Sequence, residues 1–157
     1  MRNIRSRRAV SPVIATVILV AVAITVAVAV AYWMGGIAGQ YTKFEKVEIQ
    51  TAICNYNTTD TVWTIEMKLK NTGTATSTMV AAFINDREVQ NYNETSFIAG
   101  ETATNLEPTT TTIKSGEPKT IYFWIGLGYE SLSAGTTVNI KIHSAGGMDY
   151  IKLVELV

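Results

Sequence analysis

The pattern of hydrophobic and polar positions divides this chain into two parts. Val10 to Thr42 contains no charged residue, and Ser11 and Pro12 stand at its start. Serine is a favoured N-cap, and proline fits the first helical position because its missing N–H would have had no partner there. The 23 residues from Pro12 to Met34 would extend about 34 Å as a helix, which is enough to cross a bilayer core of about 30 Å.

Two other interpretations of this run are weaker. Valine and alanine alternate from Ala21 to Ala31, but strands usually have 4 to 8 residues, and a lone strand in lipid leaves its backbone unsatisfied. A cleaved secretory signal has an apolar region of only about 7 to 15 residues. We therefore expect a membrane-spanning helix. Three glycines follow it, and the sequence leaves open whether the helix continues to Tyr41 or breaks there.

Beyond residue 43 the hydrophobic positions alternate with period two, which is typical of half-buried strands. The expected strands are 47–53, 63–69, 78–84, 87–92, 119–127, 136–143 and 148–156. With turns between them and no second helical pattern, they predict an α+β chain: a long N-terminal apolar helix followed by an immunoglobulin-like antiparallel β-sandwich head. The polar segment Asn93 to Pro108 is expected to be an exposed loop.

Alternation also predicts which side chains face the core. One strand should bury Val47, Ile49, Thr51 and Ile53; the next Trp63, Ile65, Met67 and Leu69; a later one Ile121, Phe123, Ile125 and Leu127; and the strand at 136–143 Val138, Ile140 and Ile142. This arrangement leaves Tyr122 and Trp124 on the outer face, as a possible contact surface of the head. The loop before Pro108 could equally cover them.

Composition and charge set further limits. The 157 residues leave room for the helix and one further domain, and the formal net charge of zero hides an asymmetry. Residues 1–9 carry four arginines and no acid, whereas the remainder has nine basic and 13 acidic residues, or −4. A basic start before a spanning segment favours a cytoplasmic N-terminus, which places the head outside. After the basic leader, the sequence contains no basic stripe of the kind that would indicate a nucleic-acid partner.

No catalytic or metal-binding constellation is apparent, and no cofactor is expected. The single histidine, His143, falls on an outer strand face, and the single cysteine, Cys54, falls on the polar face of its strand. We expect both to be inert, although the sequence does not exclude a Cys54–His143 dyad, and we expect no enzyme activity. Asn57 and Asn93 begin N-glycosylation sequons in segments predicted to be exposed.

Small residues recur at four-residue spacing along the helix. They are Ala23, Ala27, Ala31, Gly35 and Gly39, here called the small-residue ridge. Such ridges allow helix backbones to approach closely, which favours helix–helix association in apolar surroundings.

The N-terminal residues from Arg7 to Ala15, RRAVSPVIA, with the apolar helix after them, resemble archaeal type IV pilins that carry a class III signal peptide. The resemblance implies that Arg7 and Arg8 are recognised by a prepilin peptidase, which cuts between Ala9 and Val10. Ser11–Pro12 would then open the mature helix. It also implies a membrane-inserted precursor, an assembly ATPase with a membrane platform, and a homopolymer in an extracellular pilus.

The chain departs from related families in two ways. Bacterial type IV pilins have glutamate at the fifth mature position, where this chain has Ile14. Archaellins usually begin their helix with glycines and without Ser-Pro, so the resemblance favours an adhesion pilus. The expected organisation is a cleaved leader at 1–9, helix and neck at 10–42, and a head at 43–157. Alternatives are an anchored extracellular module binding a ligand through 93–108, or a minor or tip pilin.

Overall fold

The computed structural model describes residues 11–96 and 100–157, which form two compact units, one ending at Thr42 and one covering Lys43–Val157. The first unit is helix α1 (Pro12–Tyr41), which starts at the predicted proline. The Ser11 carbonyl accepts a hydrogen bond from the Ala15 N–H at 3.1 Å, but the Ser11 side chain makes no capping bond. The helix runs through all three glycines, and the Thr42 N–H closes it on Ala38 O at 3.2 Å.

The second unit consists of short strands with one turn of 3₁₀ helix, η1 (Tyr129–Ser131). Nine strands lie in the described residues: β1 (Val47–Asn57), β2 (Val62–Asn71), β3 (Ser77–Ile84), β4 (Arg87–Glu88), β5 (Thr102–Thr104), β6 (Thr112–Ile113), β7 (Pro118–Gly126), β8 (Thr137–Ser144) and β9 (Asp149–Glu155).

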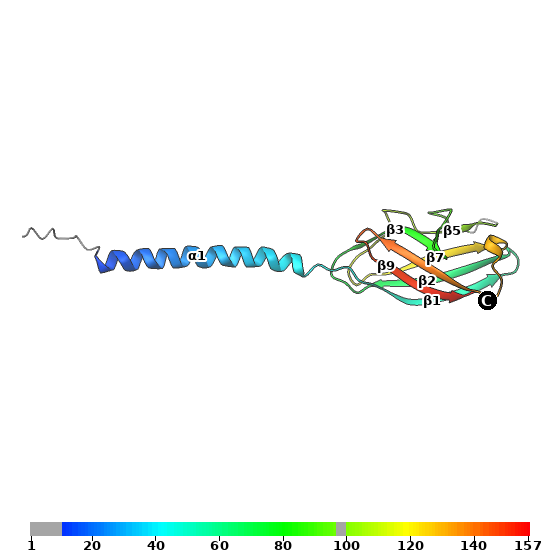
Figure 1. Ribbon diagram of the computed structural model, residues 1–157, viewed down its shortest axis with the longest axis horizontal. Helices are drawn as coiled ribbons and strands as arrows, with labels where there is room; N and C mark the ends of the chain where they lie inside the picture. Colours follow the sequence, from blue (N-terminus) through cyan, green and yellow to red (C-terminus); the bar gives the residue numbers. More distant parts are fainter. Residues whose placement is uncertain (1–10, 97–99) are drawn as a thin grey trace, which may run out of the picture. The chain divides into compact units, whose positions relative to one another are not determined.

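The strands pair antiparallel into two sheets that face each other (Figure 1). One sheet has the order β1-β2-β7-β5, and the other has the order β4-β3-β8-β9, with β6 also paired to β3. Most neighbours are distant in sequence, as when β2 pairs with β7. The predicted fold class, a long apolar helix followed by an antiparallel sandwich head, is confirmed.

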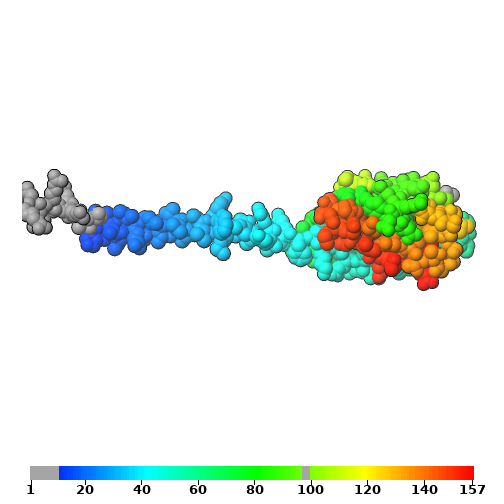
Figure 2. Space-filling view, in the orientation of Figure 1, coloured from blue at the N-terminus to red at the C-terminus, as the bar shows by residue number. Residues whose placement is uncertain are grey.

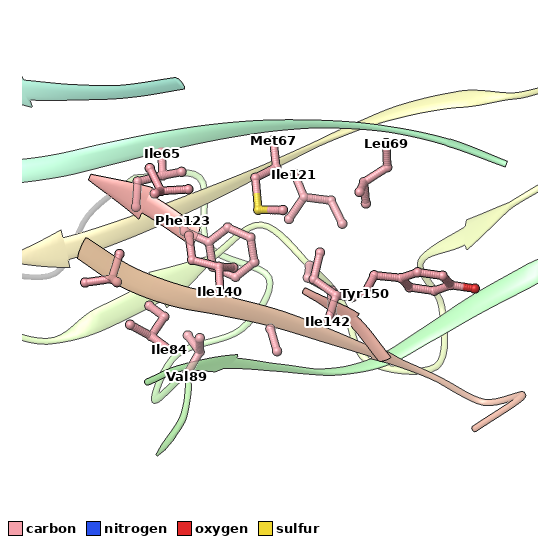
Figure 3. Close-up of a cluster of buried hydrophobic side chains, with 14 of the residues drawn as sticks. Ile65, Met67, Leu69, Ile84, Val89, Ile121, Phe123, Ile140, Ile142 and Tyr150 are labelled. Atoms are coloured by element: carbon pink, nitrogen blue, oxygen red, sulfur yellow. The ribbon is translucent and has the colours of Figure 1, made fainter. Parts of the chain in front are cut away.

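The core lies between the sheets and is built by alternate residues of their central strands. Figure 3 shows Ile65, Met67 and Phe123 of one sheet directed toward Ile140 and Ile142 of the other. All five are fully buried. Period-two alternation in β2 and β8 therefore gave the correct inward faces, because a strand that is regular throughout keeps one face buried.

Two predicted core positions in β1 are wrong. The pairing of β1 with β2 slips at Gln50, so Ile49 opposes Leu69 but Thr51 opposes Lys68. Such a β-bulge exchanges the two faces beyond it, and Thr51 and Ile53 therefore point outward while Ala52, Cys54 and Tyr56 pack against the core.

Leu127 is also exposed, at 51%. Strand β7 ends one residue earlier, at Gly126, so the alternation that predicted a buried Leu127 no longer applies there.

The segment between β4 and β7 differs from the prediction as well. The strand expected at 87–92 ends at Glu88, and the chain then crosses to the other sheet, where Asn91 N–H donates to Thr102 O at 3.1 Å. The loop expected to be exposed contains β5, whose three residues are all buried, and Leu106 is fully buried. Pairing with β7 supplies the burial that the polar sequence of this segment did not suggest.

The stretch before β1 is held against the turn between β2 and β3. Phe44 O accepts hydrogen bonds from Thr74 N–H and Ala75 N–H, both at 3.0 Å. Lys46 O accepts from Thr72 N–H and Gly73 N–H at 2.8 and 3.0 Å. A Cβ on Gly73 would lie 2.5 Å from both Lys46 N and Phe44 O. Only glycine therefore fits this backbone-to-backbone contact without displacement.

Glu45 joins this same stretch to the opposite sheet. Its carboxylate accepts hydrogen bonds from the hydroxyl of buried Ser77 on β3 and from the Tyr150 hydroxyl on β9, the latter at 3.0 Å. Burial, and then the neighbouring Glu45 carboxylate, raise the pKa of Tyr150. The entry of the chain into the head is thus fixed to both sheets.

Candidate functional site

Helix α1 has an apolar surface on all sides. None of its residues is buried, and all but the half-buried Ile37 are exposed (Figure 2). Its 30 residues include no charge, and it is long and apolar enough to cross a membrane. A helix that is apolar on all sides requires lipid or other helices around it.

The hydroxyls of the two threonines within the helix are satisfied by the helix itself. The Thr16 hydroxyl donates to Val13 O and the Thr25 hydroxyl donates to Ala21 O, each at 2.8 Å. Such bonds allow threonine to enter an apolar phase without an unsatisfied donor.

Two large aromatic side chains, Tyr32 and Trp33, mark a level along the helix. They are 86% and 66% exposed. Tyr32 lies 20 residues beyond Pro12, or about 30 Å along the axis, which equals the thickness of a bilayer core. Tyrosine and tryptophan are typical of membrane interfaces, so the helix has the dimensions of a span from Pro12 to Tyr32 with a further segment beyond it.

The small-residue ridge lies entirely on exposed positions of α1. Residues four apart form a continuous row inclined to the helix axis. A Cβ added at Gly35, Gly36 or Gly39 would meet nothing within 4 Å, so no contact within the described chain requires these glycines. Glycine costs a helix about 1 kcal/mol relative to alanine. The three together cost about 3 kcal/mol, and no side-chain-sized contact at these positions within the described residues accounts for that cost.

The predicted processing site is only partly visible. Arg7, Arg8, Ala9 and Val10 lie outside the described residues, whereas Ser11 and Pro12 open the helix. Cleavage before the helix therefore remains a prediction.

On the outer face of the β1-β2-β7-β5 sheet, Tyr122 and Trp124 stand next to each other as predicted. Their rings are nearly parallel, with centroids 6.0 Å apart and planes 20° apart. Both are half-buried and line a groove of about 410 Å³ with Thr64, Glu94, Thr95 and Asn105. The loop before Pro108 thus forms a wall beside the rings and leaves the groove open.

Hydrogen bonds hold this wall against β7. Tyr122 N–H donates to Asn105 Oδ1 at 2.8 Å, and the Thr104 hydroxyl donates to Tyr122 O at 2.8 Å. Glu94 N–H donates to Thr104 O at 2.9 Å. Glu94, Thr95 and Asn105 were missed by sequence reasoning because no local pattern indicates which strand a polar loop lies beside.

The two sequon asparagines differ in their surroundings. The Asn57 side chain is part of a turn, where Nδ2 donates to Asp60 Oδ2 at 2.6 Å and Oδ1 accepts from Thr59 N–H at 3.0 Å. Asn93 is exposed, with a left-handed φ of 58°, and its side chain makes no hydrogen bond within the described part of the chain. Asn93 is therefore the more accessible acceptor.

The two candidate chemical residues are far from a catalytic arrangement. His143 faces outward from β8, where its Nδ1 lies 2.6 Å from Asp149 Oδ1. Cys54 faces the interior from β1 in the other sheet, contrary to the prediction that it lies on the polar face, because the bulge at Gln50 shifts the phase. Burial raises the pKa of its thiol. Within residues 11–96 and 100–157, no three His, Cys, Asp or Glu residues are grouped to hold a metal ion.

No protein-family model matches this sequence, and no curated protein matches it. Among solved structures, the chain is similar to the archaeal flagellum of Methanospirillum hungatei strain JF1, with 16% identity over 94% of both chains and a TM-score of 0.47. It is similar to the Iho670 flagellar-like filament, with 12% identity over 93% of this chain and 98% of that chain and a TM-score of 0.37.

A third similar structure is the archaellum periplasmic stator protein FlaG from Sulfolobus acidocaldarius. It has 17% identity over 71% of this chain and all of that chain, with a TM-score of 0.44. Two of these structures are thus filaments, and the third belongs to the archaellum. At these identities and TM-scores the likenesses establish neither a family nor a function for the chain.

Proposed function

We propose that this chain is a structural subunit of an archaeal surface filament, an adhesion-type pilus that polymerises through α1. The observation that carries the proposal is a 30-residue apolar helix without one buried residue. Such a surface is stable in lipid or in a bundle of identical helices. A subunit that moves from the membrane into the bundle keeps its apolar surface covered throughout.

The small-residue ridge supports the second location. Lipid is about as apolar as leucine, so moving the helix from lipid to a bundle gains little from burial, and close packing must supply the gain. The glycines at 35 and 39 permit that approach, and their cost to an isolated helix is then offset by contacts between subunits.

The residues before the helix support a processing step. In this proposal a prepilin peptidase recognises Arg7 and Arg8 and cuts between Ala9 and Val10, which leaves Ser11–Pro12 near the new N-terminus. An assembly ATPase and its membrane platform then extract the helix. Before assembly the precursor spans the membrane with its N-terminus in the cytoplasm, in accord with the four arginines of residues 1–9.

Mass spectrometry of filaments sheared from cells tests both processing and assembly. The proposal predicts this protein in the filament fraction with Val10 as its first residue. An N-terminus at Met1, an N-terminus at Tyr32 as ordinary signal cleavage after Ala31 would leave, or absence of the protein from sheared filaments contradicts it. An intact leader with extraction only by detergent would instead indicate an anchored binding module, which the groove at Tyr122 and Trp124 would suit.

A matched pair of helix variants tests the ridge. Ala27→Leu adds bulk on the ridge, whereas Ala29→Leu makes the same change about 200° away around the helix. Both variants should insert into membranes, since leucine suits lipid. Ala27→Leu should reduce the filament yield more strongly than Ala29→Leu, and equal yields would refute packing through the ridge.

A further inference from the structure

The groove beside Tyr122 and Trp124 has a composition that suits one class of small ligand. Its surface is mostly apolar, and two nearly parallel aromatic rings line it. A half-buried pair of large rings on an outer sheet face loses part of its contact with water without gaining a place in the core. Tyrosine and tryptophan in such positions commonly mark contact sites, because they combine an apolar body with a polar tip.

The rest of the groove is lined by short, uncharged hydrogen-bonding groups and one carboxylate. Thr64 and Thr95 carry hydroxyls, Asn105 an amide and Glu94 a carboxylate. The Asn105 oxygen is held by the Tyr122 N–H at 2.8 Å, which fixes the orientation of that side chain. A few fixed polar groups around an apolar surface are the usual arrangement of a small-molecule site.

The chemistry of these groups separates the possible ligand classes. Among the residues that the structure describes, no lysine or arginine lines the groove, so phosphates and nucleic-acid strands, which require a basic surface in addition to aromatic stacking, do not fit. A sugar ring has an apolar face of C–H groups and an edge of hydroxyls, and these match the two kinds of surface. We propose that this groove is a saccharide-binding site.

The position of a sequon next to the groove gives the saccharide two possible sources. Asn93 immediately precedes Glu94 and Thr95, which line the groove, and Glu94 is tied to Thr104 beside β7. The same sugar chemistry could thus belong to a glycan attached to Asn93 of this chain or to a glycan on another surface. The proposal does not depend on filament formation, since the groove lies within one head.

The experiment uses the full chain from cells that lack N-glycosylation, solubilised in a polyoxyethylene detergent. This choice avoids maltoside headgroups, which are sugars, and phosphocholine headgroups, which are cations. The chain is screened on an array of neutral and acidic oligosaccharides, and the strongest binder is then titrated by isothermal titration calorimetry, whose signal does not depend on Trp124. Trp124→Ala, Trp124→Phe and Thr120→Ala are compared with the wild type. Thr120 is a half-buried residue of β7 that does not line the groove.

The proposal predicts that at least one oligosaccharide binds. Trp124→Ala should weaken binding at least about tenfold, which corresponds to 1.4 kcal/mol, while Trp124→Phe should retain most of the affinity and Thr120→Ala all of it. Circular dichroism of each variant establishes that the fold is retained. Binding that is unaffected by Trp124→Ala overturns the proposal.

A second arm identifies the source by comparing chain from its own cells with its Asn93→Gln variant. If the occupant is the attached glycan, the native chain should not bind the array, and Asn93→Gln should restore binding and make Trp124 more accessible to acrylamide. If the occupant is external, both should bind equally. The site is refuted if no saccharide binds the unglycosylated chain and acrylamide quenching is the same in both. It is also refuted if tetramethylammonium binds in a Trp124-dependent manner and no saccharide does.

Discussion

Replacing Gly73 with alanine should loosen the attachment of the chain to the base of the head. The new Cβ would lie 2.5 Å from Lys46 N and Phe44 O, where an ordinary contact begins at 3.4 Å. Both are backbone atoms, so the stretch before β1 must move by about 1 Å. Overpacking of this kind destabilises a protein by about 1 to 3 kcal/mol.

The magnitude follows from the bonds at this contact. Four backbone hydrogen bonds, to Phe44 O and Lys46 O, cross it at 2.8 to 3.0 Å, and each contributes about 0.5 to 1.5 kcal/mol. Losing half of them costs about 1 to 3 kcal/mol, and alanine returns up to about 1 kcal/mol by restricting the unfolded chain. A net loss of about 1 to 2 kcal/mol remains.

Thermal unfolding of the full chain in detergent measures this effect. Near-UV circular dichroism reports on the packed head, because Trp63 is buried and its indole N–H donates to Val157 O at 3.0 Å. For a head of 115 residues, a loss of about 1 to 2 kcal/mol should lower Tm by about 4 to 8 °C. Gly35→Ala is the control, since its added Cβ meets nothing within 4 Å and should leave the Tm of the head unchanged. If the Tm of Gly73→Ala lies within about 2 °C of the wild-type Tm, the attachment of the stretch before β1 to the turn after β2 is not rigid.

Three further predictions concern the head. Asn71 is fully buried and makes three hydrogen bonds, to Ala75 O, Ile113 O and Gly73 N–H; Asn71→Ala should lower the free energy of unfolding in guanidinium by about 3 kcal/mol, and a loss below about 1 kcal/mol would contradict this. Burial, chiefly, raises the pKa of Tyr92 to about 12. This pKa lies above that of a tyrosine in the unfolded chain, which is near 10. The contribution of Tyr92 to the free energy of unfolding is therefore fully present below pH 10 and is lost as pH rises toward 12. Tyr92→Phe should make the fall in denaturant midpoint over this range shallower, and parallel curves would refute the assignment. The Cys54 thiol, with its pKa raised by burial, should react with a thiol reagent at pH 8 at least about tenfold more slowly in the native chain than in guanidinium; equal rates would show that it is exposed.

The sequence predicted the helix closely because its determinants are local. Ser11, Pro12 and the uncharged run specify where it starts and that it must be apolar on every side. The glycines left its end open, since a weak helix former in this position is compatible with both continuation and a break. The structure shows a continuous helix to Tyr41.

In the head, local alternation predicted the regular strands. It failed where the pairing between strands determines which side chains are buried. Nothing near Gln50 indicates a bulge, yet the register against β2 places one there and turns Ile53 outward. Likewise, β5 is buried only because β7 lies beside it. Tyr122 and Trp124 were correctly assigned to the outer face by alternation. The wall that makes them part of a groove depends on hydrogen bonds to Asn105, 17 residues before Tyr122.

The amino-acid sequence by itself determined the start and apolar character of α1, the inward faces of β2 and β8, and the position of the aromatic pair. These features depend on the order of neighbouring residues and on helical or strand periodicity. Only the tertiary structure decided the phase of β1 beyond Gln50, the burial of β5, the contact at Gly73 and the groove beside Tyr122 and Trp124. Each of these joins segments that are distant in the chain, and the geometry of their pairing is set by the whole sandwich, which no local pattern encodes.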